Sequence, residues 1–370
     1  MLGPLYDDEL HAKRIDSLAN GAAGVLRSAR LSIHAIGAAY AELAEIRPKH
    51  GIKQVDRFLS NPAFDVAELT APWARYVIGA REEAVIALDW TDFDDDDHMT
   101  LAAYLVTSHG RATPLTWKTV DKKSLKGKQK KYEFDLVKRL AAAIADDVRV
   151  TLIADRGFGD IAFFKHVKKL GWDYAIRIRG NILVETQDGR CMPASDRVQR
   201  GGRAARLPDV LLTKKRELIP AVITKRQSGS KDPWCIATSL GDSKASEIID
   251  LYRKRMSIEE TFRDQKDLRF GLGLRATHIR DAARRDRLLL LTAIAQALLT
   301  LLGAASEETG MDMYLKANTV KRRTHSLLRQ GTYWYGAMPR MREDWLRTLI
   351  EAFDRIVSQH QIFTKVFAVI

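Results

Sequence analysis

The stretch LYRKRMSIEETFRDQKD, from Leu251 to Asp267, decides how the rest of the chain is interpreted. It is rich in Glu, Lys, Arg and Met and contains no Gly or Pro, which predicts one helix. At about 100° per residue, four polar side chains share an arc roughly 60° wide: Tyr252, Arg255, Glu259 and Lys266. Cations and a carboxylate beside an apolar seam suit a cleft that holds a metal and a polyanion. A solvated face with ordinary i,i+4 pairs is the alternative, and spacing alone does not decide between them.

Composition narrows the class of partner. The chain has 370 residues, 46% of them hydrophobic, which is enough for a sizeable core in two or three domains. A formal charge of +13 and a pI of about 9.6 favour nucleic acid, or less often an anionic membrane surface. Two cysteines, Cys191 and Cys235, show no zinc-binding spacing and suit a reducing cytosol. The segment MLGPLYDDEL has no signal-peptide layout, so we expect a cytoplasmic protein.

One uncharged segment, Leu288 to Ala305, has nearly the length of a membrane span. Its polar residues Thr292, Gln296 and Thr300 recur every four residues and so form one stripe on a helix. A buried helix with a partly polar side explains this stripe better than a lipid-facing helix does. We therefore predict no membrane association.

Residues 1–75 are predicted to form a helical DNA-binding domain. Apolar residues recur at helical spacing until Pro48, and the basic amphipathic segment KHGIKQVDRFLSNPAF follows. Two helices separated by a short Gly-containing break are compatible with a DNA-reading unit, in which Lys53 and Arg57 are the candidate contacts. A plain helical bundle is the alternative.

The periodicity then changes to that of strands. AVIAL and RVTLIA are short apolar runs typical of buried strands, and each is followed by an acid, Asp89 and Asp155 respectively. MTLAAYLV and ATPLTWKTV predict two further strands, which suggests a meander at one edge of a mixed sheet. DRGFGD predicts a tight turn into a helix capped by Asp160. The lysine-rich VDKKSLKGKQKK is expected to be a loop that faces water or phosphate.

These patterns predict an α/β (α+β) mixed-sheet core, interrupted by an insertion and flanked by helical regions. The core is expected in two parts, residues 76–180 and 234–310. Residues 181–233 contain several glycines and short β-like runs, which predict a β-rich insertion. Residues 311–370 are expected to form a C-terminal helical region.

Three acids are candidates for chemistry: Asp89 and Asp155 at strand ends, and Glu259 on the helix. Such carboxylates can bind two divalent cations about 4 Å apart, and Mg²⁺ prefers these hard oxygen ligands. The chain contains no Walker A loop. Asp92 is an alternative to Asp89, which we favour because it directly follows the apolar run. Glu260 lies about 100° around the helix from Glu259 and is expected to face solvent.

The four residues on the helix form a recognisable signature. Tyr252-x2-Arg255-x3-Glu259-x6-Lys266 resembles the Y-x2-R-x3-E-x6-K signature of insertion-sequence-four type DDE transposases. The strand before Asp89, the D-R-G-F at Asp155 and the β insertion look like the same family. The resemblance spans about residues 40–335, and four positions at three spacings make it quite specific.

The resemblance implies a fold and a set of roles. The core would be RNase H-like, and Asp89, Asp155 and Glu259 would be the catalytic acids that hold Mg²⁺ or Mn²⁺, with two ions expected. The implied contacts to DNA phosphates are Tyr252, Arg255 and Lys266. Trp234 resembles a family tryptophan that stacks near a base flipped during hairpin formation, although a plain core position is the alternative.

The resemblance also implies an activity. The protein would be a cut-and-paste transposase that cleaves its element's ends and joins the freed 3′-hydroxyl to target DNA, with a hairpin intermediate. It would act on terminal inverted repeats as a homodimer in a paired-end complex, in a prokaryotic cytoplasm and associated with the nucleoid. A metal-dependent nuclease without strand transfer and an inactive DNA-binding derivative that acts as an inhibitor are the alternatives.

The last helix offers one candidate for contact between two copies. Apolar residues recur there at three- and four-residue spacing: Trp345, Leu349, Phe353, Ile356 and Val357. This stripe is expected either to pair with a second copy or to pack on the chain's own core.

Overall fold

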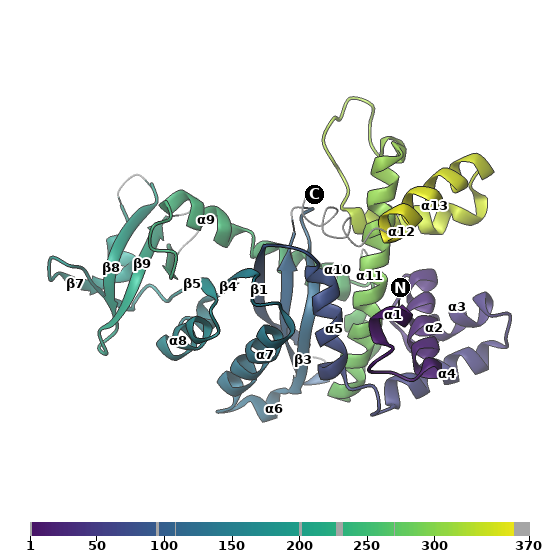
Figure 1. Ribbon diagram of the computed structural model, residues 1–370, viewed down its shortest axis with the longest axis horizontal. Helices are drawn as coiled ribbons and strands as arrows, with labels where there is room; N and C mark the ends of the chain where they lie inside the picture. Colours follow the sequence, from purple (N-terminus) through teal and green to yellow (C-terminus); the bar gives the residue numbers. More distant parts are fainter. Residues whose placement is uncertain are drawn as a thin grey trace.

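A mixed β-sheet runs from the middle of the molecule to one end, and helices fill the other end (Figure 1). In this computed structural model residues 2–93, 96–107, 109–199, 202–226, 232–269 and 271–358 are described. Within those residues the sheet has ten strands in the order β3-β2-β1-β4-β5-β10-β9-β8-β6-β7. The mixed α/β class predicted from the sequence is confirmed.

The strands fall into two groups along this sheet. The central group is β1 (Glu83–Phe93), β2 (His98–Val106), β3 (Ala112–Asp121), β4 (Arg149–Ala154) and β5 (Asp173–Arg177). The outer group is β6 (Leu183–Glu185), β7 (Cys191–Pro193), β8 (Ala205–Leu212), β9 (Glu217–Lys225) and β10 (Trp234–Thr238). β1, β2 and β3 form the predicted antiparallel meander at the sheet edge, while β4 pairs in parallel with both β1 and β5.

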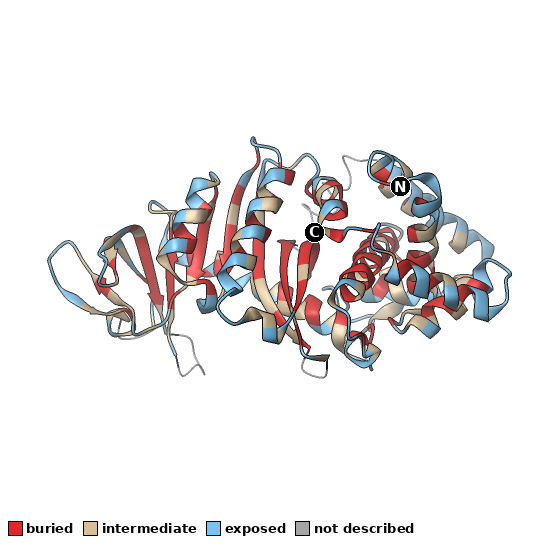
Figure 2. Cartoon of the chain, turned by 90° about the horizontal axis from the view of Figure 1, so that it is seen from below, coloured by how far each residue is buried: buried red, intermediate tan, exposed pale blue. Residues whose placement is uncertain are grey.

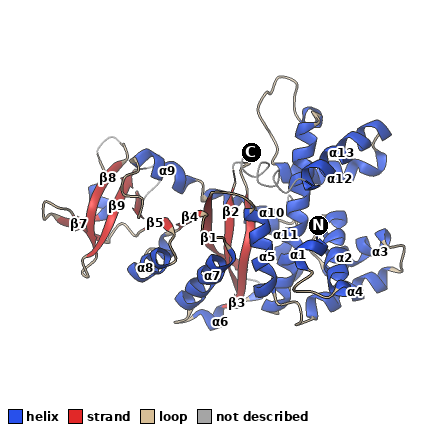
Figure 3. Cartoon of the chain, viewed as in Figure 1, coloured by secondary structure: helices blue, strands red, loops and turns tan. Residues whose placement is uncertain are grey.

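The predicted insertion lengthens the main sheet. β10 pairs antiparallel with β5 on one side and with β9 on the other, so hydrogen bonding is continuous from the core into the insertion. β8, β9 and β7 accordingly lie at the far end of the molecule from the helical regions (Figure 3). Residues 200–201 and 227–231 of the insertion lie outside the described part of the chain.

Five helices precede the sheet, as the helical periodicity of this region predicts. They are α1 (Leu2–Tyr6), α2 (Ala12–Ser28), α3 (Ile33–Leu43), α4 (Pro48–Ser60) and α5 (Val66–Ile78). Pro48 occupies the first turn of α4, where its missing N–H costs no hydrogen bond. α3 and α4 cross at two glycines, because a Cβ on Gly37 would lie 2.3 Å from the Ile52 Cα and one on Gly51 would lie 2.2 Å from the Gly37 carbonyl oxygen.

Helices also pack around the central strands. They are α6 (Lys122–Leu125), α7 (Gln129–Ala143), the short 3₁₀ helix η2 (Arg156–Phe158) and α8 (Ile161–Lys169). The lysine-rich segment before α7 was predicted to be a loop, but α6 and the start of α7 form within it. Ion pairs relieve part of the repulsion there, since Lys122 lies 2.7 Å from Asp92 and Lys130 lies 3.2 Å from Asp160.

One long helix, α11 (Ala282–Glu308), runs through the interior as the buried-helix interpretation predicts (Figure 2). Among the described helices it alone is apolar and long enough to cross a membrane, yet 94% of its apolar window is buried inside the fold. Its polar stripe is hydrogen-bonded internally. Thr292 donates to the Leu288 carbonyl at 2.8 Å, and the Gln265 amide donates to Gln296 Oε1 at 2.9 Å.

Two more helices complete the C-terminal end, α12 (Leu327–Ala337) and α13 (Glu343–Ser358). Leu349 and Ile356 of α13 are buried in a cluster that includes residues of α11 and α12. The other members of the apolar stripe, Trp345, Phe353 and Val357, are partly buried against the same cluster. The stripe therefore packs on the chain's own core, so the hypothesis that this face pairs with a second copy is wrong for Leu349 and Ile356.

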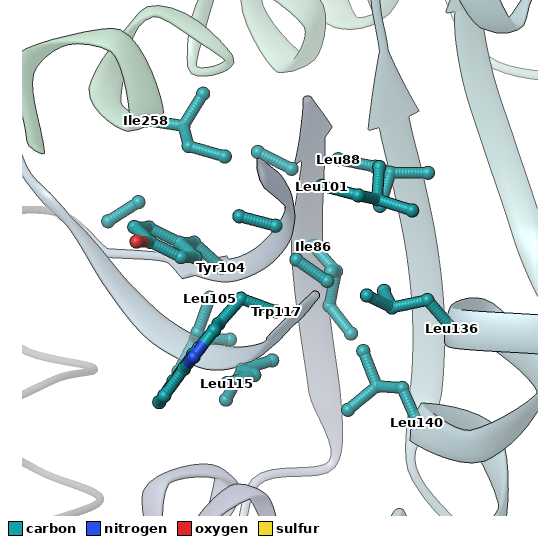
Figure 4. Packing of buried hydrophobic residues seen from close by; sticks show 14 of the residues in the cluster. Ile86, Leu88, Leu101, Tyr104, Leu105, Leu115, Trp117, Leu136, Leu140 and Ile258 are labelled. Atoms are coloured by element: carbon teal, nitrogen blue, oxygen red, sulfur yellow. The ribbon is translucent and has the colours of Figure 1, made fainter. Parts of the chain in front are cut away.

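The core around β1 fixes the position of the acids. Ile86 and Leu88 of β1 pack among side chains of β2 and β3, and Leu136 of α7 reaches the same cluster (Figure 4). Ile258, on the helix that carries Glu259, is fully buried in this cluster as well. Since β1 and this helix share one packed core, their side chains cannot shift independently.

Candidate active site

Asp89 and Asp155 are neighbours because of strand register. β1 and β4 are parallel, and their last paired residues are Leu88 and Ala154. Asp89 and Asp155 are the next residue on each strand, so the two carboxylates emerge side by side. β1 was expected to end at Asp89, but it continues to Phe93 because β2 still pairs with it beyond that point, with Asp89 opposite Ala102.

Asp89 lies in a nearly closed environment. Its side chain is 18% exposed, one carboxylate oxygen accepts from the Trp90 N–H at 2.9 Å, and the other lies 3.0 Å from Arg255 Nη1. Burial raises the pKa of Asp89 to about 6; Arg255 lowers it, whereas the charges of Asp155 and Glu259 raise it. Asp155 and Glu259 are therefore each close enough to Asp89 for their charges to act on it.

Asp155 ends β4 and precedes η2. Its backbone carbonyl accepts from the Phe158 N–H at 3.0 Å, which closes the turn that the two glycines of DRGFGD predict. Its Oδ1 is buried and has no hydrogen-bond partner within the described residues. A buried carboxylate oxygen without a partner lowers stability, so a hydrogen-bond donor or a cation bound to this atom would be favourable.

The signature stretch was predicted to be one helix, and here the structure differs. It forms α9 (Ala245–Arg253) and α10 (Met256–Lys266), with a break at Lys254 and Arg255. At the break the Arg255 N–H donates to the carbonyl three residues back, at Tyr252, in a tightened turn. The predicted common arc of four residues is therefore interrupted, and Tyr252 belongs to a different helix from Glu259 and Lys266.

Arg255 stands at this break between two acids. One terminal nitrogen pairs with Asp89, and the other pairs with Glu259 four residues along α10. The Arg255 side chain is 11% exposed and that of Glu259 is 39% exposed. Burial lowers the pKa of Arg255, but its interactions with Tyr252, Asp89 and Glu259 outweigh that effect and raise it above the usual value. Arg255 is therefore a permanent cation that joins two of the three predicted acids.

Two aromatic residues form the wall beside Arg255. Tyr252 is buried, and its ring lies edge-on to that of Trp234 with centroids 5.1 Å apart. The Arg255 guanidinium lies 5.9 Å from the centre of the Tyr252 ring. Burial raises the pKa of Tyr252 to about 12, so its hydroxyl remains a proton donor at neutral pH. Trp234 is partly buried against the core.

Lys266 lies at the other end of α10. Its ammonium donates to the Asp92 carbonyl at 2.6 Å and lies 4.5 Å from the centre of the Phe93 ring. These contacts tie the end of α10 to the end of β1. Glu259 and Lys266 are seven residues apart, which is about 10 Å along a helix.

The alternative residues occupy other environments. Asp92 lies three positions beyond Asp89 on β1, which places it on the opposite face of the strand, and it pairs with Lys122. Asp94 and Asp95 lie outside the described residues. Asp160 accepts from the Phe163 N–H at 3.1 Å as the predicted cap of α8. Glu260 was expected to face solvent, but it is only 31% exposed and pairs with Arg263 at 2.9 Å.

Lys53 and Arg57 are not part of this site. Both are exposed on α4, four residues apart and so on one face of that helix. α4 packs on α3, α2 and α11, and none of these carries one of the three acids. The two cations therefore form a separate surface.

The sequence interpretation missed two features near the acids. Trp90, next to Asp89, donates its indole N–H at 2.9 Å to Glu133, a buried residue of α7. In addition, Arg156, the residue after Asp155, lines a cavity of about 430 Å³ together with Arg177 and Arg179. Asp196 and Asp232 also line this cavity, and Arg156 lies 3.3 Å from Asp232. The only signals in the sequence are the arginine after Asp155 and the alternation RIR at the end of β5, and neither reveals a shared cavity.

The donor chemistry of the acids fits a hard divalent cation. Asp89, Asp155 and Glu259 supply carboxylate oxygens, and Asp155 Oδ1 has no partner among the described residues. Within those residues no three His, Cys, Asp or Glu side chains are arranged as a metal-binding cluster. Arg255, paired with Asp89 and Glu259, supplies positive charge between them. The assignment of these acids as ligands stays a prediction.

In a comparison with protein families, residues 120–298 match a family described as a transposase DDE domain. The matched range contains Asp155 and Glu259 and begins after Asp89. A comparison with curated proteins gives no match. The mixed sheet is consistent with the RNase H-like core of DDE transposases. The match supports a DDE transposase, a class of DNA-processing enzyme that generally uses divalent metal ions.

Proposed function

We propose that this chain is a cut-and-paste DNA transposase of the insertion-sequence-four type. It would cleave the ends of its element and join the 3′-hydroxyl to target DNA. One observation carries the proposal: Asp89, Asp155 and Glu259 come from three separate elements and all act on the charge of Arg255, which pairs with Asp89 and Glu259. Burial raises the pKa of Asp89, and the charges of Asp155 and Glu259 raise it further, so this grouping of acids does not stabilise the fold and indicates a functional site.

The acids would hold Mg²⁺ or Mn²⁺, and we propose two ions. When bound, such ions would activate the attacking oxygen and stabilise the leaving oxygen. The chain's own residues prepare this site. Arg255 keeps the Asp89 and Glu259 carboxylates oriented toward each other, and the buried hydroxyl of Tyr252 remains protonated beside them.

DNA binding is proposed for three surfaces. The exposed face of Lys53 and Arg57 would make residues 1–75 a DNA-binding domain, and Lys266 would contact a backbone phosphate at the far end of α10 from Arg255. The arginine-lined cavity next to Asp155 offers a third site for phosphate, because arginine matches phosphate in charge and geometry. Trp234 lies beside Tyr252, where a ring could stack on an unpaired base during hairpin formation.

The remaining divisions of the chain are proposed on the same basis. Residues 76–180 and 234–310 would form the catalytic core, 181–233 the insertion and 311–370 a C-terminal helical region, of which 359–370 lie outside the described residues. The strand pairing of β10 with both β5 and β9 means that core and insertion share one sheet.

A homodimer in a paired-end complex is proposed because two element ends have to be cut and joined together. Its contact would not use Leu349 or Ile356, since both are buried within one copy. Light scattering of the protein with DNA from either side of its reading frame should show two copies per complex. Strand transfer by a complex with one copy would contradict this.

A plasmid assay tests the proposed activity. The substrate carries the DNA that flanks the reading frame, with one strand labelled at the junction, and Mg²⁺ is present. We expect labelled ends that are first released and then joined to a second plasmid. Release without joining would instead identify a nuclease, and binding without release would identify an inactive DNA-binding derivative. The Asp155→Ala variant is the control for contaminating nuclease.

A further inference from the structure

A second cavity lies at the end of α10 remote from Arg255. It has a volume of about 500 Å³, and its lining is Arg263, Lys266, Asp267, Leu268, Arg275, Ala276 and His278. Among these described residues there are three permanent cations and one carboxylate. We name it the Arg275 pocket. Lys266 belongs to the signature, whereas Arg275 and Arg263 have no role in the site described above.

Cations outnumber carboxylates three to one in the lining of this pocket. Arg263 pairs with Glu260 at 2.9 Å but is 68% exposed, and an exposed pair of this kind neutralises little. The Asp267 carboxylate accepts from the Arg269 backbone N–H at 2.8 Å. Arg275 is exposed and makes no hydrogen bond or ion pair within the described part of the chain. The pocket therefore keeps a positive potential.

The backbone around the pocket is held firmly. The segment after α10 folds back, and the N–H groups of Leu272 and Gly273 donate to carbonyls of Asp264 and Asp267 at 2.8 and 2.9 Å. A Cβ on Gly271 would lie 2.2 Å from the Asp264 carbonyl oxygen, so only glycine permits this close approach. Arg275 is thus presented from a short 3₁₀ helix, η4 (Leu274–Thr277), that is anchored on α10.

The distance from the pocket to the acids can also be compared with the spacing of phosphates in DNA. Glu259 and Lys266 are seven residues apart on α10, or about 10 Å at ~1.5 Å per residue. Along the axis of a duplex, the phosphates of one strand advance by about 3.4 Å each, so a span of this length parallel to the axis corresponds to roughly three phosphates. Leu268, which is 67% exposed in the pocket lining, offers an apolar surface of the kind that a deoxyribose can contact.

We propose that the Arg275 pocket binds the DNA sugar–phosphate backbone about three phosphates from the reacting phosphate, with Arg275 as the principal new contact. The inference rests on the proposed function for the location of the reacting phosphate. The contact itself does not depend on cleavage. A purely structural role is the competing explanation, because cations near the end of α10 also complement the negative end of the helix dipole.

Affinity for a fluorescent DNA duplex of unrelated sequence, measured across a salt series without divalent cations, separates these explanations. Loss of one phosphate contact should lower the slope of log affinity against log salt by about 0.9. We expect this for Arg275→Ala and a larger loss of affinity for Arg275→Glu. Arg340→Ala is the matched control, because Arg340 is also exposed and ends a short 3₁₀ helix, η6 (Met338–Arg340).

The outcomes distinguish this inference from the proposed function. An unchanged slope in both Arg275 variants, or an equal change in Arg340→Ala, would overturn the pocket assignment. If the wild-type protein cuts and joins DNA but the Arg275 variants have the same salt slope as the wild type, the pocket assignment is wrong and the proposed transposase activity still holds. If Arg275→Ala lowers the salt slope but the wild-type protein does not cut DNA, the pocket assignment holds and the proposed activity is wrong. Unchanged thermal unfolding of the variants shows that the fold is retained.

Discussion

Two arginines with little solvent contact occupy contrasting sites in this molecule. The Arg255 side chain is 11% exposed and pairs with Asp89 and Glu259. The Arg285 side chain has no exposed surface, pairs with the almost fully buried Asp96, and donates to the Ile279 carbonyl at 3.0 Å. Its guanidinium also lies 4.2 Å from the centre of the Phe93 ring. Each therefore combines acidic and aromatic partners.

The balance of charge separates them. Tyr252 and the three acids act on Arg255, and together their effect exceeds that of burial, so its pKa is raised. At Arg285 burial dominates and its pKa is lowered despite Asp96 and Asp286. Around Arg255 the acids outnumber the cation, so further cations can bind there. Arg285 and Asp96, by contrast, form a closed pair in which the two charges neutralise each other. Excess charge, rather than burial, is what indicates a functional site here.

The surroundings of Arg285 show what a closed pair does. It lies on the first turn of α11, where Arg284 pairs with Asp56 of α4 at 2.7 Å. Arg287 donates to the carbonyls of Leu59 at 2.8 Å and Phe64 at 3.1 Å. These contacts at the start of α11 therefore hold α4, and the segment after it, against the helix that runs through the core.

Removal of any one of the three acids around Arg255 should have the largest effect, which is on DNA cleavage. Asp89→Ala, Asp155→Ala and Glu259→Ala are each expected to reduce DNA cleavage on the order of 10³-fold or more, because charge stabilisation of the reaction is lost. Binding to DNA should be largely retained, since phosphate contacts supply most of the affinity. A plasmid cleavage assay beside a gel-shift assay measures both.

Glu260→Ala is the matched control for that experiment, and it should remain active. Glu260 is adjacent in sequence but pairs with Arg263 and not with Arg255. An inactive Glu260 variant together with an active Glu259 variant would contradict the assignment of the third acid.

The second-largest effect is expected on stability, when the pair between Arg285 and Asp96 is broken. Arg285→Ala leaves the Asp96 carboxylate buried without its cation, which is expected to cost about 3–5 kcal/mol in the free energy of unfolding. Arg284→Ala removes a more exposed pair and should cost about 0.2–1 kcal/mol. Urea unfolding measures both, and equal losses would show that burial of the pair is not the deciding factor.

The pH dependence of stability tests the environment of Asp89. Its pKa is raised from 3.8 to about 6, so between these values the folded protein holds a proton that the unfolded chain has lost. Stability should therefore fall by about 3 kcal/mol as pH rises through this window and stay level above it. Asp89→Asn should lack this contribution.

The comparison is made by urea unfolding with a chelator present, at several pH values from 4 to 7. Asp286 has a pKa raised to about 6 by burial and contributes a similar fall to both proteins, so the difference between wild type and variant isolates Asp89. Identical pH profiles would contradict the raised pKa.

The smallest expected effect concerns the salt dependence of DNA binding. Lys266→Ala and Arg255→Ala should each lower the slope of log affinity against log salt by about 0.9, one phosphate each. Arg340→Ala should leave the slope unchanged, because Arg340 ends η6 in the C-terminal region, outside the surfaces proposed to bind DNA. Unchanged slopes for both Lys266 and Arg255 would mean that these cations serve the fold alone.

Much of the secondary structure could be predicted from local patterns. The apolar runs before Asp89 and Asp155, the cap at Asp160 and the buried helix with its polar stripe all agree with the structure. These features depend on neighbours in sequence, since periodicity and capping act over a few residues. Among the local predictions that were wrong are the lysine-rich loop and the single helix over residues 251–267. In both cases contacts with distant residues, Asp92 and Asp160 in one and Asp89 in the other, accompany the altered backbone.

The sequence by itself determined the residue types and their spacing: three acids, four signature positions and an excess of positive charge. Only the tertiary structure decided which of them meet. Arg255 reaches Asp89 across 166 residues, and Asp89 lies beside Asp155 because β1 and β4 share a parallel register. The Arg275 pocket likewise needs the segment after α10 to fold back on it. Such contacts result from packing a whole core, and no local pattern encodes how distant segments are brought together.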